Sequence, residues 1–464
     1  MAKSHRSSTQ PSTLPTHTAG PRREFDCQVR HIPTGRLEVL KPTIPFTGGA
    51  CSALAIGALT GIATITSTLR IPGWTFLSYG DIPAAFLVIA FALSVLNRYG
   101  PSLHPAWRST AGLFLLFAGI LIVADLNGWS RYGEDVFLLL LGHTLKWLMY
   151  ATAGMLSVSL RPNRRVSYVV GFIAASVVYA GVMSTMYYLD PASRLDALGG
   201  LSNPQIDKVQ GVRVDTGKNA YALHLALILA LVLEVTPPRF RSAPWLPMLR
   251  FLTAAGLVLA INIAASRTGL VAVFLILILF ARSAKRRFWL CVATGLAIFL
   301  LVVYPVLYSS FASLHRTTSS ITAGNELYGL DLGNRTNLAR DSLSDIWATP
   351  IVGRGFFAKF YANDVLVPSG AHNLYIQLVI ESGFVGLILW IALTWNLIRL
   401  ALAVRHTWLG YAPLSIVFTL AVTAVSEVYL EGPGMICTLS VLACLSIAER
   451  TTRVRRRYWR HLLA

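Results

Sequence analysis

The stretch "GAHNLYIQLVIESGFVGLILW", residues 370–390, places Gly, His and Asn directly in front of a long apolar run. A helix needs about 20 apolar residues to cross the hydrocarbon core of a bilayer, and this run has the composition to form one. The stretch therefore predicts a membrane helix with a titratable side chain, that of His372, at its mouth.

The same apolar pattern recurs along the chain of 464 residues, of which 54% are hydrophobic and only 13% are charged. This composition excludes a soluble globular protein of this size. We expect an all-α polytopic membrane protein with about twelve transmembrane helices of roughly 20 residues each. The apolar windows centre near residues 57, 88, 116, 147, 177, 228, 257, 275, 298, 389, 417 and 440.

The charged residues are distributed unevenly among the loops. The 40 Lys and Arg outnumber the 21 Asp and Glu, which gives a formal net charge of +19. Basic clusters recur in alternate loops and at the C-terminus, as "RPNRR", "RFRSAPW", "ARSAKRRF" and "RTTRVRRRYWR", whereas most acids fall in the other loops. This pattern follows the positive-inside rule and predicts that both termini are cytoplasmic. The basicity therefore indicates topology rather than nucleic-acid binding, and anionic lipids of the inner leaflet are the expected partner.

Three regions are expected along the chain. Residues 1–45 are rich in Ser, Thr, Pro and Arg without an apolar signal-peptide core, which predicts a disordered cytoplasmic tail. Residues 46–448 hold the transmembrane bundle, and residues 449–464 form a basic cytoplasmic C-tail. Two outer segments, 189–218 and 309–372, are long, and long ordered loops in compact proteins are usually functional. The five cysteines show no CxxC spacing, so neither a zinc site nor a disulfide framework is indicated.

The second long outer segment contains "RTNLARDSLSDIW", residues 335–347, followed by "ATPIVGRGF". Its apolar residues suit a short amphipathic helix at the membrane surface; they are Leu338, Leu343, Ile346 and Trp347. The Pro and Gly residues that follow supply the turn chemistry that ends this helix.

Three arginines and one histidine are expected on the outer face of the membrane. Arg213 and Arg267 directly precede apolar windows, Arg335 lies in the long loop, and His372 opens the helix of the first stretch. Guanidinium groups stay charged and grip phosphate oxygens through paired hydrogen bonds. This set fits a lipid-linked phosphate or pyrophosphate as substrate.

The order of these elements carries a resemblance. "SRTG" before a helix, then "GNRTNLARDSLSDIWATPIVGRGF", then "HNLYIQLVIESGFVGLILW" resembles the bacterial O-antigen ligase and O-antigen polymerase superfamily, over roughly residues 210–400. The resemblance implies a membrane glycosyltransferase of the GT-C type. Such enzymes move a glycan from undecaprenyl pyrophosphate to an acceptor on the periplasmic face of the inner membrane, without a metal and without a cofactor.

The resemblance also implies roles for single residues. His372 would be the catalytic histidine, and Arg213, Arg267 and Arg335 would bind the pyrophosphate. Arg213 follows the family pattern only loosely, so Lys218 or Arg340 are alternatives for its place; Arg354 and Asn373 are further candidates. No metal ligand is expected, because no Asp or Glu cluster accompanies the arginines.

The chemistry agrees with these roles. An acceptor hydroxyl loses its proton as it attacks the anomeric carbon, and an imidazole, with an ordinary pKa near 6.5, suits that task. Arginines in a water-poor pocket would stabilise the departing pyrophosphate. A single displacement of this kind inverts the anomeric centre.

Other interpretations stay open for each residue. His372 at a helix mouth could be an anchor, Arg267 a snorkelling residue, and Arg354 a brace of its turn. His143 and Lys146 share one face of the fourth helix, where Lys146 could pair with a buried acid such as Glu427. These two stay outside the predicted site.

The sequence favours an O-antigen ligase that transfers the glycan onto lipid A-core. A polymerase of O-antigen or exopolysaccharide, using the same donor and a glycan acceptor, is the alternative. A secondary transporter is a more distant one, since no internal repeat is detectable and only His143 and Lys146 lie well inside apolar windows. The sugars, the linkage and the oligomeric state are left open.

Overall fold

A computed structural model describes residues 49–67, 77–94, 105–189, 208–209, 212–213, 218–236, 242–263, 267–281, 346–356, 373–425 and 433–463. The chain divides into two units, Met1–Pro42 and Thr43–Ala464, and all of the described residues belong to the second. They are helical apart from short turns and one hairpin of two-residue strands, β1 (Lys208–Val209) and β2 (Val212–Arg213).

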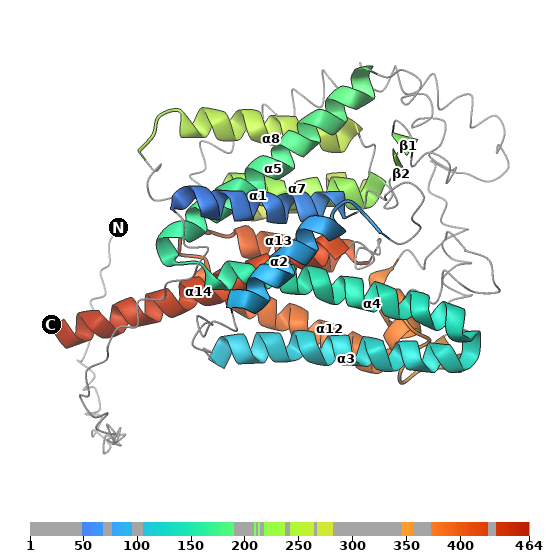
Figure 1. The fold of residues 1–464 in the computed structure, drawn as a ribbon. Helices are drawn as coiled ribbons and strands as arrows, with labels where there is room; N and C mark the ends of the chain where they lie inside the picture. Colours follow the sequence, from blue (N-terminus) through green and yellow to red (C-terminus); the bar gives the residue numbers. More distant parts are fainter. Residues whose placement is uncertain are drawn as a thin grey trace, which may run out of the picture. The chain divides into compact units, whose positions relative to one another are not determined.

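The helices of the second unit are arranged as a bundle (Figure 1). In chain order they are α1 (Ala50–Thr66), α2 (Asp81–Ser94), α3 (Pro105–Tyr132), α4 (Glu134–Met155), the 3-10 turn η2 (Leu156–Ser159), α5 (Pro162–Leu189), α7 (Lys218–Glu234), α8 (Leu246–Ile263), α9 (Arg267–Ala281), α12 (Leu374–Val404), α13 (Ala412–Thr423) and α14 (Pro433–Leu463). A helix coincides with every predicted window except the one near residue 298, which lies outside the described residues.

Five of the described helical segments are long and apolar enough to cross a membrane. They are Arg108–Arg131, Val136–Ser159, Pro162–Thr185, Leu374–Val404 and Pro433–Val454; the other apolar helices described have 10–17 residues. Large apolar side chains also point outward from the bundle, among them Phe86, Leu115, Phe274, Ile388 and Trp395, each more than half exposed. A surface of this kind suits lipid tails rather than water. The all-helical membrane character is thus confirmed, while the twelve-helix count and the large periplasmic loop stay predictions.

Small residues let the helices approach closely. A methyl group added at Gly57 of α1 would overlap the backbone oxygen of Tyr168 in α5, and one at Gly171 of α5 would overlap that of Leu54. Gly154 of α4 meets Cys437 of α14 in the same way. Close backbone approach through small residues is how membrane helices gain packing energy. It places α14 in the middle of the bundle, where 89% of its apolar window is buried.

The basic segment after residue 448 continues α14 as a helix to Leu463. At its start, Glu449 pairs with Arg165 of α5 over 3.1 Å, and both side chains are nearly buried. Ser52 of α1 lines the same pocket as Arg161 and Arg164. The beginning of α1 and the part of α14 around Glu449 therefore lie near the same end of α5.

The bundle contains an ion pair that involves Lys146. Lys146 of α4 pairs with Asp81 at the start of α2, over 2.9 Å between Nζ and Oδ2. Asp81 also accepts hydrogen bonds from the Ser78 backbone and hydroxyl and from the Tyr150 hydroxyl, at 2.7, 2.8 and 2.9 Å. Asp81 is within reach of Lys146 because the start of α2 packs against α4. Glu427, the acid expected from the sequence, lies outside the described residues, so that pairing stays a prediction.

Candidate functional site

The helix of the opening stretch, α12, begins at Leu374 and is broken at Gly383. Asn373 caps its first turn: its side-chain oxygen accepts hydrogen bonds from the backbone of Tyr375 at 2.9 Å and of Ile376 at 3.1 Å. Asn prefers this position because its short side chain can reach those free N–H groups. Asn373, a candidate for substrate binding, therefore has a structural task that occupies its side-chain oxygen.

The break at Gly383 leaves backbone groups without helical partners, and residues 349–356, called here the 349–356 turn, bind them. Before the break, the carbonyls of Ile380 and Glu381 accept from the N–H groups of Arg354 and Gly355, at 2.9 and 3.0 Å. Beyond the break, the N–H groups of Phe384 and Val385 donate to carbonyls of Pro350 and Ile351, at 2.8 and 3.4 Å. Unsatisfied backbone groups are costly at membrane depth, so the turn is what makes the broken helix stable there.

Glycine is required on both sides of this contact. Gly383 has φ 68° and Gly353 has φ 80°, a region that other L-residues rarely adopt. A methyl group at Gly383 would overlap the carbonyl of Ile351, and one at Gly353 would overlap the backbone of Glu381 and Ser382. The "VGRGF" and "ESGF" sequences thus fit one another through their backbones.

The other side of the 349–356 turn is held by α3 and α4. The buried carboxylate of Asp125 accepts from the backbone of Phe356 at 2.8 Å and from the Thr144 hydroxyl at 2.7 Å. Asn127 donates to the carbonyl of Gly353 at 2.5 Å, and Arg131 donates to that of Ala348 at 3.2 Å. The helical residues that precede the turn end at Ala348, as the Pro and Gly residues predict.

A polar pair lies buried beside the break. Gln377 donates to Glu381 over 2.5 Å, and both side chains are at most 2% exposed. Sequence reasoning missed Asp125 and Glu381, because it found only His143 and Lys146 well inside apolar windows. A single carboxylate inside an otherwise apolar run is the signal that marks both residues.

The helix beginnings near this region can be located from contacts along the chain. The start of α12 lies at the end of α13, since Leu374 donates to the Ala424 carbonyl at 2.8 Å. The start of α13 lies at the end of α7, since Tyr411 approaches Glu234 at 3.4 Å. Because α7 and α13 pack together, they run in opposite directions, and α7 begins at the same end of the bundle as α12.

The start of α9 joins this end by the same reasoning. Arg250, in the first turn of α8, donates to the carbonyl of Val235 just after α7, so α8 runs back along α7. Its end at Ile263 is followed closely by Arg267, the first residue of α9. The first residues of α7, α9 and α12, which are Lys218, Arg267 and Leu374, therefore lie at one end.

The predicted site residues differ in how much of each the structure describes. It describes the Arg354 side chain as partly buried on the 349–356 turn. It describes only the backbone of Arg213, Lys218 and Arg267; Arg213 pairs with Lys208 in the hairpin. His372, Arg335 and Arg340 lie outside the described residues. Arg354 is therefore in direct backbone contact with α12. The side-chain geometry of the other candidates stays a prediction.

Within the described part of the chain, no three His, Cys, Asp or Glu side chains form a group that could hold a metal ion. The described polar groups beside the 349–356 turn are backbone amides, Arg131, Arg354, Asn127 and the buried Asp125 and Glu381.

The fold and this region define a class of protein. It is a helical membrane protein in which a separate turn forms backbone hydrogen bonds with a broken apolar helix. Residues 252–391 match the family described as O-Antigen ligase, which confirms the resemblance to the O-antigen ligase and polymerase superfamily. The match runs from α8 to the middle of α12 and includes the 349–356 turn and the break at Gly383. No match was found among curated proteins. Residues 252–391, less than a third of the chain, are therefore similar to the O-antigen ligase family.

Gly383→Ala tests the fit between α12 and the turn. We expect a loss of about 1–3 kcal/mol of stability, because alanine must adopt a left-handed backbone and its methyl group displaces Ile351. Thermal unfolding of the purified protein in detergent measures this, and glycan transfer should fall with it. Gly119→Ala is the matched control, since nothing lies within 4 Å of a methyl group there. A Gly383→Ala protein with the melting temperature of the wild type would show that the turn does not need this glycine.

Proposed function

We propose that the protein transfers a glycan from undecaprenyl pyrophosphate onto lipid A-core, as an O-antigen ligase, on the periplasmic face of the bacterial inner membrane. The observation that carries the proposal is the family match over residues 252–391. Arg267, Arg335, Arg354 and His372 all fall inside it, whereas Arg213 precedes it.

The backbone geometry supports a site at the end of the bundle where α7, α9 and α12 begin. Arg267 opens α9, and His372 stands two residues before α12 opens. The turn that carries Arg354 is hydrogen-bonded to the first half of α12. Rigid attachment of this kind suits a group that must hold a pyrophosphate in one position.

In the proposed reaction an acceptor hydroxyl attacks the anomeric carbon of the donor sugar. Its proton passes to the imidazole of His372, and the bond from the anomeric carbon to the pyrophosphate oxygen breaks. Undecaprenyl pyrophosphate leaves with the bonding electrons, and its charge is stabilised by Arg267 and Arg335, with Arg354 or Arg340 as further donors. Attack opposite to the leaving group inverts the anomeric centre. No metal or cofactor takes part in these steps.

A deletion strain distinguishes the ligase from the polymerase. Loss of all long chains from lipid A-core, with glycan still polymerised on the undecaprenyl carrier, is expected for a ligase. Caps of a single repeat unit on lipid A-core would instead identify a polymerase and overturn the proposal. Restoration of the chains by the wild-type gene, but not by a His372→Ala version, ties the phenotype to the proposed site.

The proposed topology has its own test. Ser320 falls in the segment 309–372 that the charge pattern assigns to the periplasm. A Ser320→Cys protein should therefore react with an impermeant thiol reagent in intact spheroplasts, and an Arg450→Cys protein only after lysis. The unmodified protein corrects for the native cysteines. Labelling of Ser320→Cys only after lysis would place the site on the other face.

A further inference from the structure

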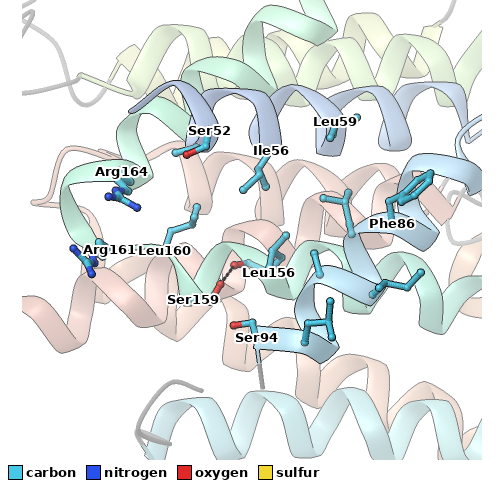
Figure 2. A pocket seen from close by; sticks show the side chains of 15 residues that line it. Ser52, Ile56, Leu59, Phe86, Ser94, Leu156, Ser159, Leu160, Arg161 and Arg164 are labelled. Atoms are coloured by element: carbon cyan, nitrogen blue, oxygen red, sulfur yellow. Dashed lines mark hydrogen bonds between the residues drawn. The ribbon is translucent and has the colours of Figure 1, made fainter. Parts of the chain in front are cut away.

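A cavity with apolar walls and a cationic end lies away from the 349–356 turn. This cavity, of about 350 Å³, opens between α1, α2 and the junction of η2 with α5 (Figure 2). Its walls are mostly apolar and include Ile56, Leu59, Phe86, Leu93, Leu156 and Leu160. Its volume is within the range of sites that bind small molecules.

The cavity faces the space that lipid tails occupy. Leu59, Phe86, Ile89 and Leu93 line it and are 42–66% exposed. Apolar side chains this exposed on a membrane helix lie against hydrocarbon. A lipid chain can therefore enter the groove sideways, between α1 and α2.

One end of the cavity is cationic. Figure 2 shows the guanidinium groups of Arg161 and Arg164 at the same end, beside Ser52 and Leu160. The neighbouring acid on α14, Glu449, is bound to Arg165 over 3.1 Å. The arginines stand at the first turn of α5, where the helix dipole adds further positive potential.

A buried hydroxyl of α2, that of Ser94, lies at the wall of the cavity. Ser94 is 3% exposed, and its Oγ has no hydrogen-bond partner among the residues described. Figure 2 shows this oxygen on the side of Ser94 that faces Ser159. The hydroxyl of Ser159 is already used, donating to the Leu156 carbonyl at 2.7 Å. A buried hydroxyl without a partner is costly, and an ester or glycerol oxygen of a ligand would satisfy it.

We propose that this cavity binds one anionic glycerophospholipid. The phosphate lies on Arg161 and Arg164, an acyl chain follows the groove between α1 and α2, and Ser94 donates to an oxygen at the glycerol ester. Arginine pairs recognise phosphate through bidentate hydrogen bonds, and the apolar walls give the chain its affinity.

The position of the cavity distinguishes this lipid from the glycan donor. Helix α4 begins beside the end of α3 that holds the 349–356 turn, and the cavity lies where α4 has ended. The two sites are therefore at opposite ends of α4. The cavity end carries the "RPNRR" cluster, which the charge pattern assigns to the cytoplasmic face, where anionic lipids attract basic residues.

Native mass spectrometry of the full-length protein in detergent tests the proposal, with phosphatidylglycerol and phosphatidylcholine of equal chain length as probes. The wild type should bind phosphatidylglycerol at least tenfold more tightly. Arg164→Gln should weaken that binding by about tenfold, and Arg161→Gln with Arg164→Gln should abolish the preference, because charge-assisted hydrogen bonds are lost. Ala90→Trp fills the groove and should reduce the binding of both lipids.

Two control variants separate the site from general charge and from misfolding. Arg450→Gln removes an exposed arginine of α14 outside the cavity and should leave binding unchanged. Ser94→Ala removes one hydroxyl and should weaken the binding of both lipids by a few-fold. It avoids the loss of fold that the large side chain of Ala90→Trp could cause. Equal binding of the two lipids by the wild type, or unchanged binding by Arg164→Gln, would overturn the proposal. So would an adduct of undecaprenyl phosphate that outcompetes phosphatidylglycerol and is lost in the same variants.

Discussion

Replacing His372 by alanine is expected to lower glycan transfer by about 10² to 10⁴, the usual span when a general base is lost. The binding of undecaprenyl pyrophosphate donor should stay nearly intact, because the imidazole is proposed to act on the acceptor hydroxyl. Donor binding and single-turnover transfer, measured on the same purified protein, separate these two effects.

The arginines give the contrasting result. Arg335→Lys or Arg267→Lys keeps the charge but loses the paired hydrogen bonds of the guanidinium group. We expect donor binding to weaken along with the rate, since each charge-assisted hydrogen bond contributes about 1.5–3 kcal/mol. A His372→Ala protein with near-normal transfer would rule out the base and leave His372 as an anchor at the mouth of α12.

Both experiments need a measure of folding. Each variant should be shown to reach the membrane and to melt as the wild type does, because a lost helix contact would also lower transfer. Asn373→Ala is an informative companion: it removes the cap of α12, so it should lower stability by about 0.5–2 kcal/mol. The transfer rate of Asn373→Ala then shows how much the rate falls when only the start of α12 is destabilised.

Replacing Lys146 by methionine is expected to destabilise the protein by about 3–5 kcal/mol, the cost of breaking a buried ion pair. Asp81 would keep the hydrogen bonds from Ser78 and Tyr150 but would lose its only recorded cationic partner among the described residues. A buried carboxylate without a countercharge is strongly unfavourable in an apolar bundle. Thermal unfolding of the purified protein measures the loss.

Two further variants identify the charge as the cause. Asp81→Asn combined with Lys146→Met removes both charges and should recover most of the stability of the wild type. Glu134→Gln changes an exposed acid on the same helix and should have an effect within about 0.5 kcal/mol. If the double variant is as unstable as Lys146→Met alone, the loss comes from packing around α4 and not from an unpaired charge.

The break in α12 explains why the 349–356 turn packs against this helix. The backbone of α12 can leave its helical path at Gly383 only if another segment binds the exposed amides and carbonyls. The turn does so and is itself fixed by Asp125 and Asn127 from α3. Arg354 lies on this turn, and its backbone N–H donates to the carbonyl of Ile380 at 2.9 Å.

The sequence by itself determined the helices and their class. Apolar windows require helices because a helix satisfies its own backbone in a membrane, and this is a local property that each window carries alone. The Pro and Gly residues after Trp347 likewise determined the end of the short helix at Ala348. The ordered motifs were sufficient to predict the resemblance that the family match over residues 252–391 confirms.

Only the tertiary structure decided which residues distant in the chain form hydrogen bonds and ion pairs with one another. Asn127 and Gly353 are 226 residues apart in the chain, and Phe356 and Asp125 are 231 apart. Lys146 pairs with Asp81, because the start of α2 packs against α4. The break in α12 at Gly383 also depends on Pro350 and Ile351 being placed beside it. Hydrophobic periodicity and turn residues describe the few residues around each position, whereas these contacts depend on which helices pack together, and that follows from the fit of the whole bundle.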